Sequence, residues 1–186
     1  VPPNVEPDVA MLNEYVFPVW VADQQFMYDT IEAWSATDPL LQGMLDVTRI
    51  GSFGHSFGGA TSLEVCRVDS RCRASVNLDG GLYGETEQQP AVHPLLLMTS
   101  AGSNELPETV ASWGSMVNNA TADAYWLELS NSNHLSFTLF PLLSPLISPP
   151  NFDPHAGLQT MDGYVRHFFD IYVRGGETPP LQPSGD

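Results

Sequence analysis

The stretch from Ile50 to Ala60, which reads Ile-Gly-Ser-Phe-Gly-His-Ser-Phe-Gly-Gly-Ala, most constrains what this chain can fold into. It contains the pattern Gly-x-Ser-x-Gly, centred on Ser56, between an apolar run and a segment of helical character. This context predicts a nucleophile elbow, a tight strand-to-helix turn that holds a serine in a strained backbone conformation. Gly54 and Gly58 are expected on either side because such a turn leaves no room there for side chains.

Helical and strand-like segments alternate along the rest of the chain, which predicts a parallel sheet covered by helices on both faces. The apolar segments expected as strands are residues 49–54, 74–78, 94–99 and 124–129. The segments expected as helices are residues 23–34, 57–66, 108–117 and 157–174. We expect residues 1–20 to be irregular and residues 178–186 to form a disordered tail, within one domain that spans residues 1–186.

Charge and composition exclude several classes of function. The chain has 186 residues, 42% of them apolar, which is enough to build one core. Its formal charge is −16, from 22 acidic and 6 basic residues. Such a chain repels phosphates, so we expect neither nucleic acid nor an anionic membrane surface as a partner. No apolar run reaches the roughly 18–20 residues of a membrane span.

Two features bear on the compartment. The chain begins at Val1 without the pattern of a signal peptide, which leaves a cytosolic protein or a secreted protein whose presequence has been removed. Cys66 and Cys72 close a short loop and are expected to form a disulfide, and Asn119 begins an Asn-x-Thr glycosylation acceptor. A reduced cysteine pair and an unused acceptor are the alternatives. Together the two features favour secretion.

A serine hydroxyl becomes a good nucleophile only when a base takes its proton and a third group orients that base. Since the carboxyl ends of parallel strands meet at one edge of the sheet, residues that follow the strands are the candidates. Asp79 follows the strand 74–78, and His134 follows the strand 124–129. The order Ser, Asp, His is the one that α/β-hydrolases use. His55, next to the serine, is expected to point away.

Glu105 is the alternative acid, because it lies in the loop after the strand 94–99, where a hydrolase acid is often found. Asp79 is preferred because that loop contains no Asp. The structural alternatives are a turn residue before two glycines for Asp79, and a surface loop histidine for His134.

Three short segments together resemble the platelet-activating factor acetylhydrolase family of α/β-hydrolases. They are residues 54–60, Asn77-Leu78-Asp79-Gly80, and His134-x-Ser136-Phe137, and the resemblance spans about residues 21–175. It implies an α/β-hydrolase fold with Ser56 as nucleophile, His134 as base and Asp79 as acid. It also implies hydrolysis of short or oxidised acyl esters without calcium, so we expect no metal and no cofactor.

The departure from this family lies at the front of the chain, where the segment before Arg49 contains no second strand–helix unit. We therefore expect the C-terminal portion of an α/β-hydrolase domain without its N-terminal strands, completed by an N-terminal companion chain. The Phe57 N–H is the first expected oxyanion donor, and the sequence offers no candidate for the second.

Several functions fit this pattern. The leading prediction is a serine carboxylic-ester hydrolase that forms an acyl-enzyme on short-chain or modified acyl esters, with a small-molecule ester or lipid as its substrate. A polyester or cutin-type esterase and a biosynthetic lactone or acyl-transfer enzyme are alternatives of the same class. A non-catalytic, hydrolase-like binding module is the alternative of another class, but such modules usually lose the serine or the histidine. Apolar residues within 137–147 are expected near the acyl pocket mouth or in the core.

Overall fold

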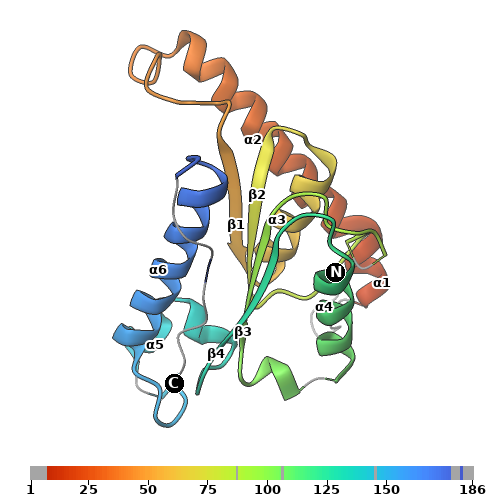
Figure 1. Cartoon of the computed structure of the whole chain (residues 1–186), viewed down its shortest axis with the longest axis vertical. Helices are drawn as coiled ribbons and strands as arrows, with labels where there is room; N and C mark the ends of the chain where they lie inside the picture. Colours follow the sequence, from red (N-terminus) through yellow and green to blue (C-terminus); the bar gives the residue numbers. More distant parts are fainter. Residues whose placement is uncertain (1–7, 87, 106, 145, 177–180, 182–186) are drawn as a thin grey trace.

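The computed structural model describes residues 8–86, 88–105, 107–144, 146–176 and 181 (Figure 1). Within these ranges the strands form a four-stranded sheet with the order β1-β2-β3-β4, and all of its pairs are parallel. The strands are β1 (Ile50–His55), β2 (Cys72–Leu78), β3 (Leu95–Ser100) and β4 (Ala124–Leu129). The predicted parallel sheet is confirmed, and β4 has the predicted bounds.

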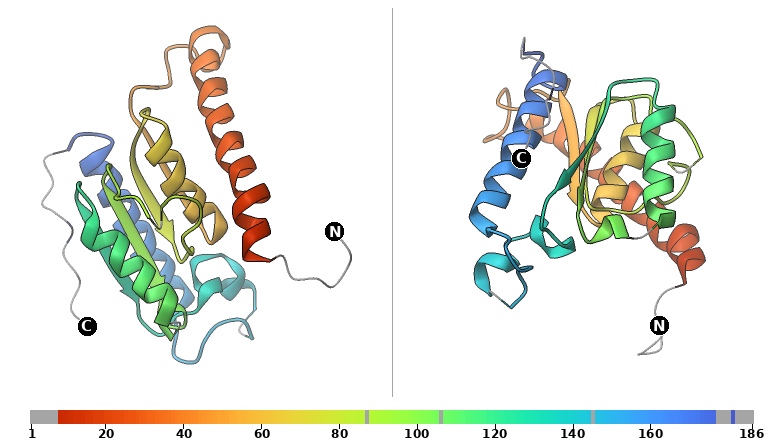
Figure 2. Two further views of the ribbon diagram at one scale, coloured as in Figure 1. Left: turned by 90° about the vertical axis from the view of Figure 1, so that its right-hand side faces the viewer. Right: turned by 60° about the horizontal axis from the view of Figure 1, so that its bottom comes forward.

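Helices cover both faces of the sheet, as Figure 2 shows. Helices α3 (Phe57–Val68) and α4 (Pro107–Asn119) lie on one face and α6 (Pro154–Tyr172) on the other, while α2 (Phe17–Thr37) packs on α3. The shorter elements are α1 (Val9–Met11), η1 (Leu12–Val16), η2 (Ser103–Glu105), η3 (His134–Phe137) and α5 (Phe140–Leu143). None of the described helices is both long and apolar enough to cross a membrane.

The core has one layer on each face, because successive side chains of a strand point to opposite faces. Leu95 and Leu97 pack with Trp113 on the α4 face. Leu96 and Met98 pack on the α6 face, together with the fully buried Phe168. This is why β3 reads as a continuous apolar run, as expected for a parallel strand buried on both faces.

The expectation that residues 1–20 are irregular is wrong for residues 9–20, which are helical. The Asp8 side chain caps the first turn, and Pro18 falls in the first turn of α2, where proline is tolerated. Phe17 and Val21 then bury against Ala60 of α3. The three prolines that suggested a loop, Pro2, Pro3 and Pro7, precede this helix in the sequence and therefore do not interrupt it.

The predicted tail, residues 178–186, lies outside the described residues except for Leu181, which is buried against the α6 face of the core. Residues 1–7 are also outside them.

The turn between α3 and β2 is tied down by a disulfide and by ion pairs. Cys66 and Cys72 are both buried and form the predicted disulfide, with their Cα atoms 4.9 Å apart. Arg71 binds Asp69 at 2.6 Å and reaches Asp29 of α2 at 2.7 Å. The hydrogen bonds from Arg71 hold the pKa of the Asp69 carboxyl below its usual value. These contacts join α2, α3 and β2 at the end of the sheet where the strands begin, opposite their C-termini.

Strand β1 lies at one edge of the sheet that the described residues form, and its Phe53 side chain is 62% exposed. The companion chain predicted to cover this edge stays a prediction.

The disulfide yields a stability prediction. Replacing both Cys66 and Cys72 by Ala should lower the free energy of unfolding by about 2 kcal/mol, because a short cross-linked loop restricts the unfolded chain. Urea unfolding of the purified protein and of the double variant measures the difference. Reduction of the native protein should also add the mass of two hydrogen atoms, whereas two thiols that alkylate without a reductant would contradict the bond.

Candidate active site

Ser56 lies between β1 and α3 in a backbone conformation that is rare for a residue with a side chain, with φ 58° and ψ −128°. Its N–H donates to the carbonyl of Leu78 at 2.9 Å, so the β1–β2 ladder continues up to the serine. Its own carbonyl accepts from Gly59 N at 2.9 Å and from Ala60 N at 3.2 Å. This strained strand-to-helix turn has the backbone geometry of the predicted elbow.

Only part of the glycine explanation from the sequence holds. A Cβ at Gly54 would overlap the backbone of Gly58, so the expectation for Gly54 fits. A Cβ at Gly58 itself would meet nothing within 4 Å, so the expectation that Gly58 is needed for space is wrong. The restricted position is Gly59, where a Cβ would overlap the carbonyl oxygen of Gly54 and the side chain of Asn77.

The turn after β2 places the Asp79 carboxylate. Asp79 also has a positive φ, 56°, and its N–H donates to Met98 O of β3 at 2.8 Å. The fully buried Asn77 side chain donates to Gly80 O at 3.0 Å and accepts from Gly80 N at 2.8 Å. Trp113 Nε1 donates to the same carbonyl at 3.0 Å. These hydrogen bonds fix the backbone on which the carboxylate stands.

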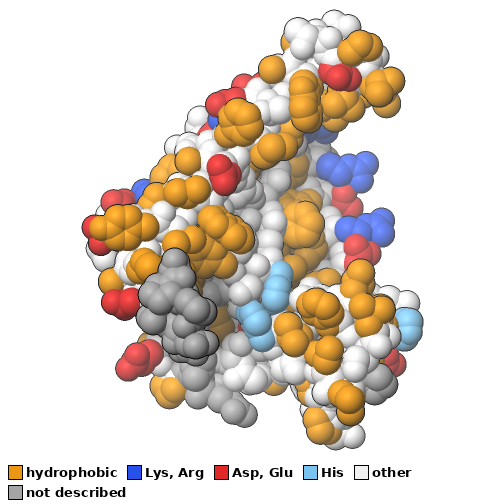
Figure 3. All heavy atoms as spheres, turned by 180° about the vertical axis from the view of Figure 1, so that it is seen from behind, with side chains coloured by type: hydrophobic (Ala, Val, Ile, Leu, Met, Phe, Trp, Pro, Cys, Tyr) orange, Lys and Arg blue, Asp and Glu red, His pale blue; other side chains and the backbone are white. Residues whose placement is uncertain are grey.

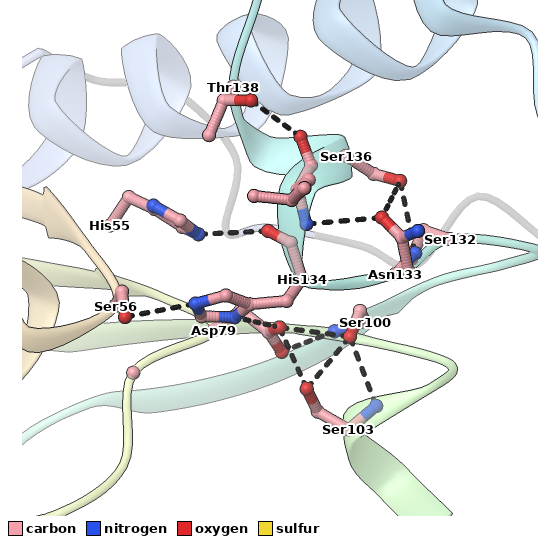
Figure 4. Close-up of polar contacts among 12 residues, drawn as sticks. His55, Ser56, Asp79, Ser100, Ser103, Ser132, Asn133, His134, Ser136 and Thr138 are labelled. Atoms are coloured by element: carbon pink, nitrogen blue, oxygen red, sulfur yellow. Dashed lines mark hydrogen bonds and ion pairs between the residues drawn. The ribbon is translucent and has the colours of Figure 1, made fainter. Parts of the chain in front are cut away.

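The Asp79 carboxylate is fully buried and accepts four hydrogen bonds (Figure 4). Oδ1 accepts from Ser100 N at 2.7 Å. Oδ2 accepts from Ser100 Oγ at 2.9 Å, from Ser103 Oγ at 2.8 Å and from His134 Nδ1 at 2.8 Å. A buried carboxylate needs such partners, since without them burial of its charge costs several kcal/mol.

His134 is the first residue of η3, and the local sequence holds its backbone in place. Asn133 caps η3, because its Oδ1 accepts from Leu135 N at 3.1 Å. In return Ser136 Oγ accepts from Asn133 N at 3.0 Å, which completes a capping box. Asn133 Nδ2 also donates to Ile147 O at 3.2 Å, so the turn is anchored to the segment that follows it.

Three predicted side chains form a continuous hydrogen-bonded chain, in which His134 Nε2 lies 2.9 Å from Ser56 Oγ. The tautomer follows from the partners, because a carboxylate can only accept. His134 therefore donates its Nδ1–H to Asp79, which leaves the Nε2 lone pair to accept from the hydroxyl of Ser56. The His134 side chain is 44% exposed, so small molecules can reach the Ser56 end of these hydrogen-bonded side chains.

The five histidines are placed differently from one another. His155 and His167 lie on α6 and His93 precedes β3, whereas His134 reaches the serine. The expectation that His55 points away is wrong, because its Nε2 lies 2.9 Å from the carbonyl oxygen of His134. Burial lowers the pKa of His55 below its usual value, and the neighbouring His134 lowers it further.

The remaining predicted site residues lie as follows. Phe57 is the first residue of α3, so its N–H has no acceptor within that helix. Asn119 is exposed at the end of α4, and its side chain donates to Ser115 Oγ at 3.2 Å. Glu105 belongs to η2. Within the described ranges, no group of three His, Cys, Asp or Glu side chains is arranged to hold a metal ion.

Apolar side chains follow both Ser56 and His134 in the sequence. The Phe57 ring contacts Trp20 at 5.0 Å and Tyr83 at 4.9 Å between centroids, and Trp20 is 47% exposed. Figure 3 shows histidines at the surface with hydrophobic side chains on either side. Of the apolar residues within 137–147, Phe137 belongs to the core, while the exposed ones are Leu139, Phe140, Leu142, Leu143 and Leu146.

Four residues that support the hydrogen-bonded side chains of Ser56, His134 and Asp79 were not predicted from the sequence. They are His55, Ser100, Ser103 and Asn133. Asn133 had a detectable signal, because Asn followed by Ser three positions later resembles a capping pattern. The two serines had only their place after a strand as a signal.

The glycine geometry yields a matched pair of variants. Gly59→Ala should lower the free energy of unfolding by about 1–3 kcal/mol, because the new Cβ overlaps backbone and a buried side chain. Gly58→Ala should leave it unchanged or raise it by up to about 1 kcal/mol, since alanine is the better helix former. Urea unfolding measures both, and equal losses in the two variants would contradict the assigned contacts.

The family model "Platelet-activating factor acetylhydrolase, isoform II" matches residues 35–156. A probable 1-alkyl-2-acetylglycerophosphocholine esterase of Arthroderma benhamiae is 35% identical over 78 residues, which cover 42% of this chain and 18% of that protein. The platelet-activating factor acetylhydrolase of Cavia porcellus is 36% identical over 62 residues, which cover 32% and 14%. The chain thus matches less than a fifth of the length of these relatives.

Two solved structures share the fold of this chain. A ferulic acid esterase from Streptomyces cinnamoneus superposes with a TM-score of 0.78 and 30% identity, covering 95% of this chain and 54% of that one. A dienelactone hydrolase-like promiscuous phosphotriesterase from metagenomic libraries superposes with a TM-score of 0.58 and 21% identity, covering 82% and 62%. The predicted α/β-hydrolase fold is confirmed, and the chain belongs to the platelet-activating factor acetylhydrolase, isoform II, family.

Proposed function

We propose that this protein is a serine carboxylic-ester hydrolase that works through an acyl-enzyme. The observation that carries the proposal is the unbroken chain of hydrogen bonds from Ser56 through His134 to the buried Asp79. Ser56 is the nucleophile, His134 the general base and Asp79 the group that orients the base. An imidazole held between a hydroxyl and a carboxylate is the arrangement that serine hydrolases use.

The chemistry follows from this arrangement. Ser56 Oγ attacks the ester carbonyl carbon while His134 Nε2 takes its proton, and the resulting imidazolium is stabilised by Asp79. The Phe57 N–H, free at the start of α3, faces the negative charge that develops on the carbonyl oxygen. His134 then protonates the departing alcohol, and a water molecule, activated in the same way, releases the acid.

The proposed substrates are esters with short or modified acyl groups, including lipid esters, because two relatives are named for such a lipid. Aromatic acyl esters are a second candidate. Phe57, the residue after Ser56, contacts the rings of Trp20 and Tyr83, and a structural relative is a ferulic acid esterase. Polyester hydrolysis and acyl transfer within the same chemistry stay as alternatives.

A non-catalytic binding module is the less favoured function. A binding protein has no need to hold a hydroxyl, an imidazole and a buried carboxylate in register. It also has no need for the strained backbone at Ser56 and Asp79, which costs of order 1–3 kcal/mol at each position.

We also propose that the protein is secreted and glycosylated, and that it takes part in lipid degradation. The disulfide between Cys66 and Cys72 and the exposed Asn119 acceptor support the first two points. Residues 1–186 are proposed as the C-terminal portion of one catalytic domain. Among the described residues, the edge position of β1 is the one observation that favours a separate companion chain along this strand. None of the comparisons supports such a chain.

Labelling with a fluorophosphonate tests the proposed nucleophile. The reagent should label the native protein at Ser56, because only a serine paired with a base attacks phosphorus quickly at neutral pH. Mass spectrometry of the labelled peptide identifies the site, and Ser56→Ala should abolish both labelling and hydrolysis of p-nitrophenyl acetate.

The exposed Ser70, which lies at the opposite edge of the sheet, provides the control, and Ser70→Ala should label like the native protein. Folded protein that resists labelling and cleaves no ester would favour the binding module instead.

A further inference from the structure

His55 stands directly before Ser56, yet its side chain turns toward the loop that carries His134 (Figure 4). Its Nε2 lies 2.9 Å from the carbonyl oxygen of His134. A carbonyl can only accept a hydrogen bond, so the Nε2 of His55 must carry the proton. The bond therefore links the elbow to the backbone of the residue whose ring receives the Ser56 proton.

The ring of His55 is also held by packing. It lies 4.4 Å from the ring of His134, at an interplanar angle of 39°, and 6.4 Å from the ring of the buried Phe137, at 22°. His55 therefore contacts η3 at its first residue and at its last. An imidazole fills this space and donates one hydrogen bond, which neither an aliphatic nor a phenyl side chain can do.

We propose that His55 is a positioning residue, which holds the backbone of His134 so that its Nε2 points at Ser56. This inference rests on the proposed function. His55 does not touch the reacting atoms, since its polar partner is a backbone carbonyl. Because His55 and Ser56 are consecutive, the strand end that places the nucleophile also places the base, and the 2.9 Å distance between Ser56 Oγ and His134 Nε2 is set locally.

The other contacts at the start of η3 show why a further anchor matters. Asn133 fixes the chain immediately before His134 through the capping box, and Asp79 fixes the ring through Nδ1. Neither of these contacts reaches the carbonyl of His134, whereas His55 donates to it directly from the residue before Ser56. A shift of about 1 Å in a catalytic group can cost of order a hundredfold in rate.

The protonation state of His55 agrees with this role. The titratable groups that act on it are His134 and Asp79, and burial together with His134 lowers its pKa. At neutral pH His55 is therefore an uncharged donor. It adds no positive charge beside His134 when that ring becomes an imidazolium during the reaction.

Two substitutions of nearly equal shape separate the hydrogen bond from the packing. His55→Gln keeps an N–H donor on a flexible chain, and His55→Met has similar length without a donor. In the methionine variant kcat for p-nitrophenyl acetate should fall by about ten- to a hundredfold, with KM within about twofold, because orientation of the base and not substrate binding is lost. The glutamine variant should recover most of that loss.

His55→Phe adds a test of the ring, because it keeps the stacking and removes the donor, and it should resemble the methionine variant. His155→Phe, an exposed histidine at the start of α6, is the matched control and should behave like the native protein. Thermal unfolding of each variant shows that the rates are measured on folded protein.

The outcomes separate the two claims. Native protein without esterase activity or fluorophosphonate labelling at Ser56 would overturn the proposed function, whatever the His55 variants do. Active native protein with a methionine variant of unchanged kcat, or with glutamine and methionine variants equally slow, would overturn the role of His55 alone. If His55→Met does not fold, the comparison of His55→Phe with His55→Gln decides in the same way.

Discussion

The site depends on a close backbone contact between the elbow and the turn that follows β2. A Cβ at Gly80 would overlap the carbonyl of Ser56, and a Cβ at Gly59 would overlap the side chain of Asn77. The two turns can approach only because both positions lack side chains. Ser56 and Asp79, each with a positive φ, are therefore held in strained conformations by one packed unit. The spacing of the Ser56 hydroxyl and the Asp79 carboxylate is a property of the fold.

The environment of Asp79 explains why one carboxylate suffices at this edge of the sheet. The last residue of β3 contributes the Ser100 hydroxyl and N–H, and η2 after it contributes the Ser103 hydroxyl, all of which donate to Asp79. In a chain with a formal charge of −16, a second carboxylate here would repel the first, whereas hydroxyls and an N–H stabilise it. The end of β3 and η2 thus stabilise Asp79, which follows the neighbouring strand β2.

Much of the fold and the main site residues could be predicted from the sequence, because both follow from simple regularities. Alternation of helices and strands implies a parallel sheet, and the strand ends of such a sheet converge, which brings Asp79 and His134 to Ser56. Other features depend on side-chain directions that periodicity does not contain. Hence the expectations for His55 and Gly58 were wrong. The helix over residues 9–20 was missed because the prolines at positions 2, 3 and 7, which suggested an irregular segment, precede it.

The measurement that tests this account most directly is the rate of ester hydrolysis by Asp79→Asn compared with Glu105→Gln. An amide at position 79 keeps the shape but favours the wrong tautomer of His134 and no longer stabilises its imidazolium, so kcat should fall by about 10⁴, as in serine proteases. Glu105→Gln should stay within a few-fold of the native rate. Near-native activity in a folded Asp79→Asn protein, with the loss found in Glu105→Gln instead, would contradict the account and move the acid to the loop after β3.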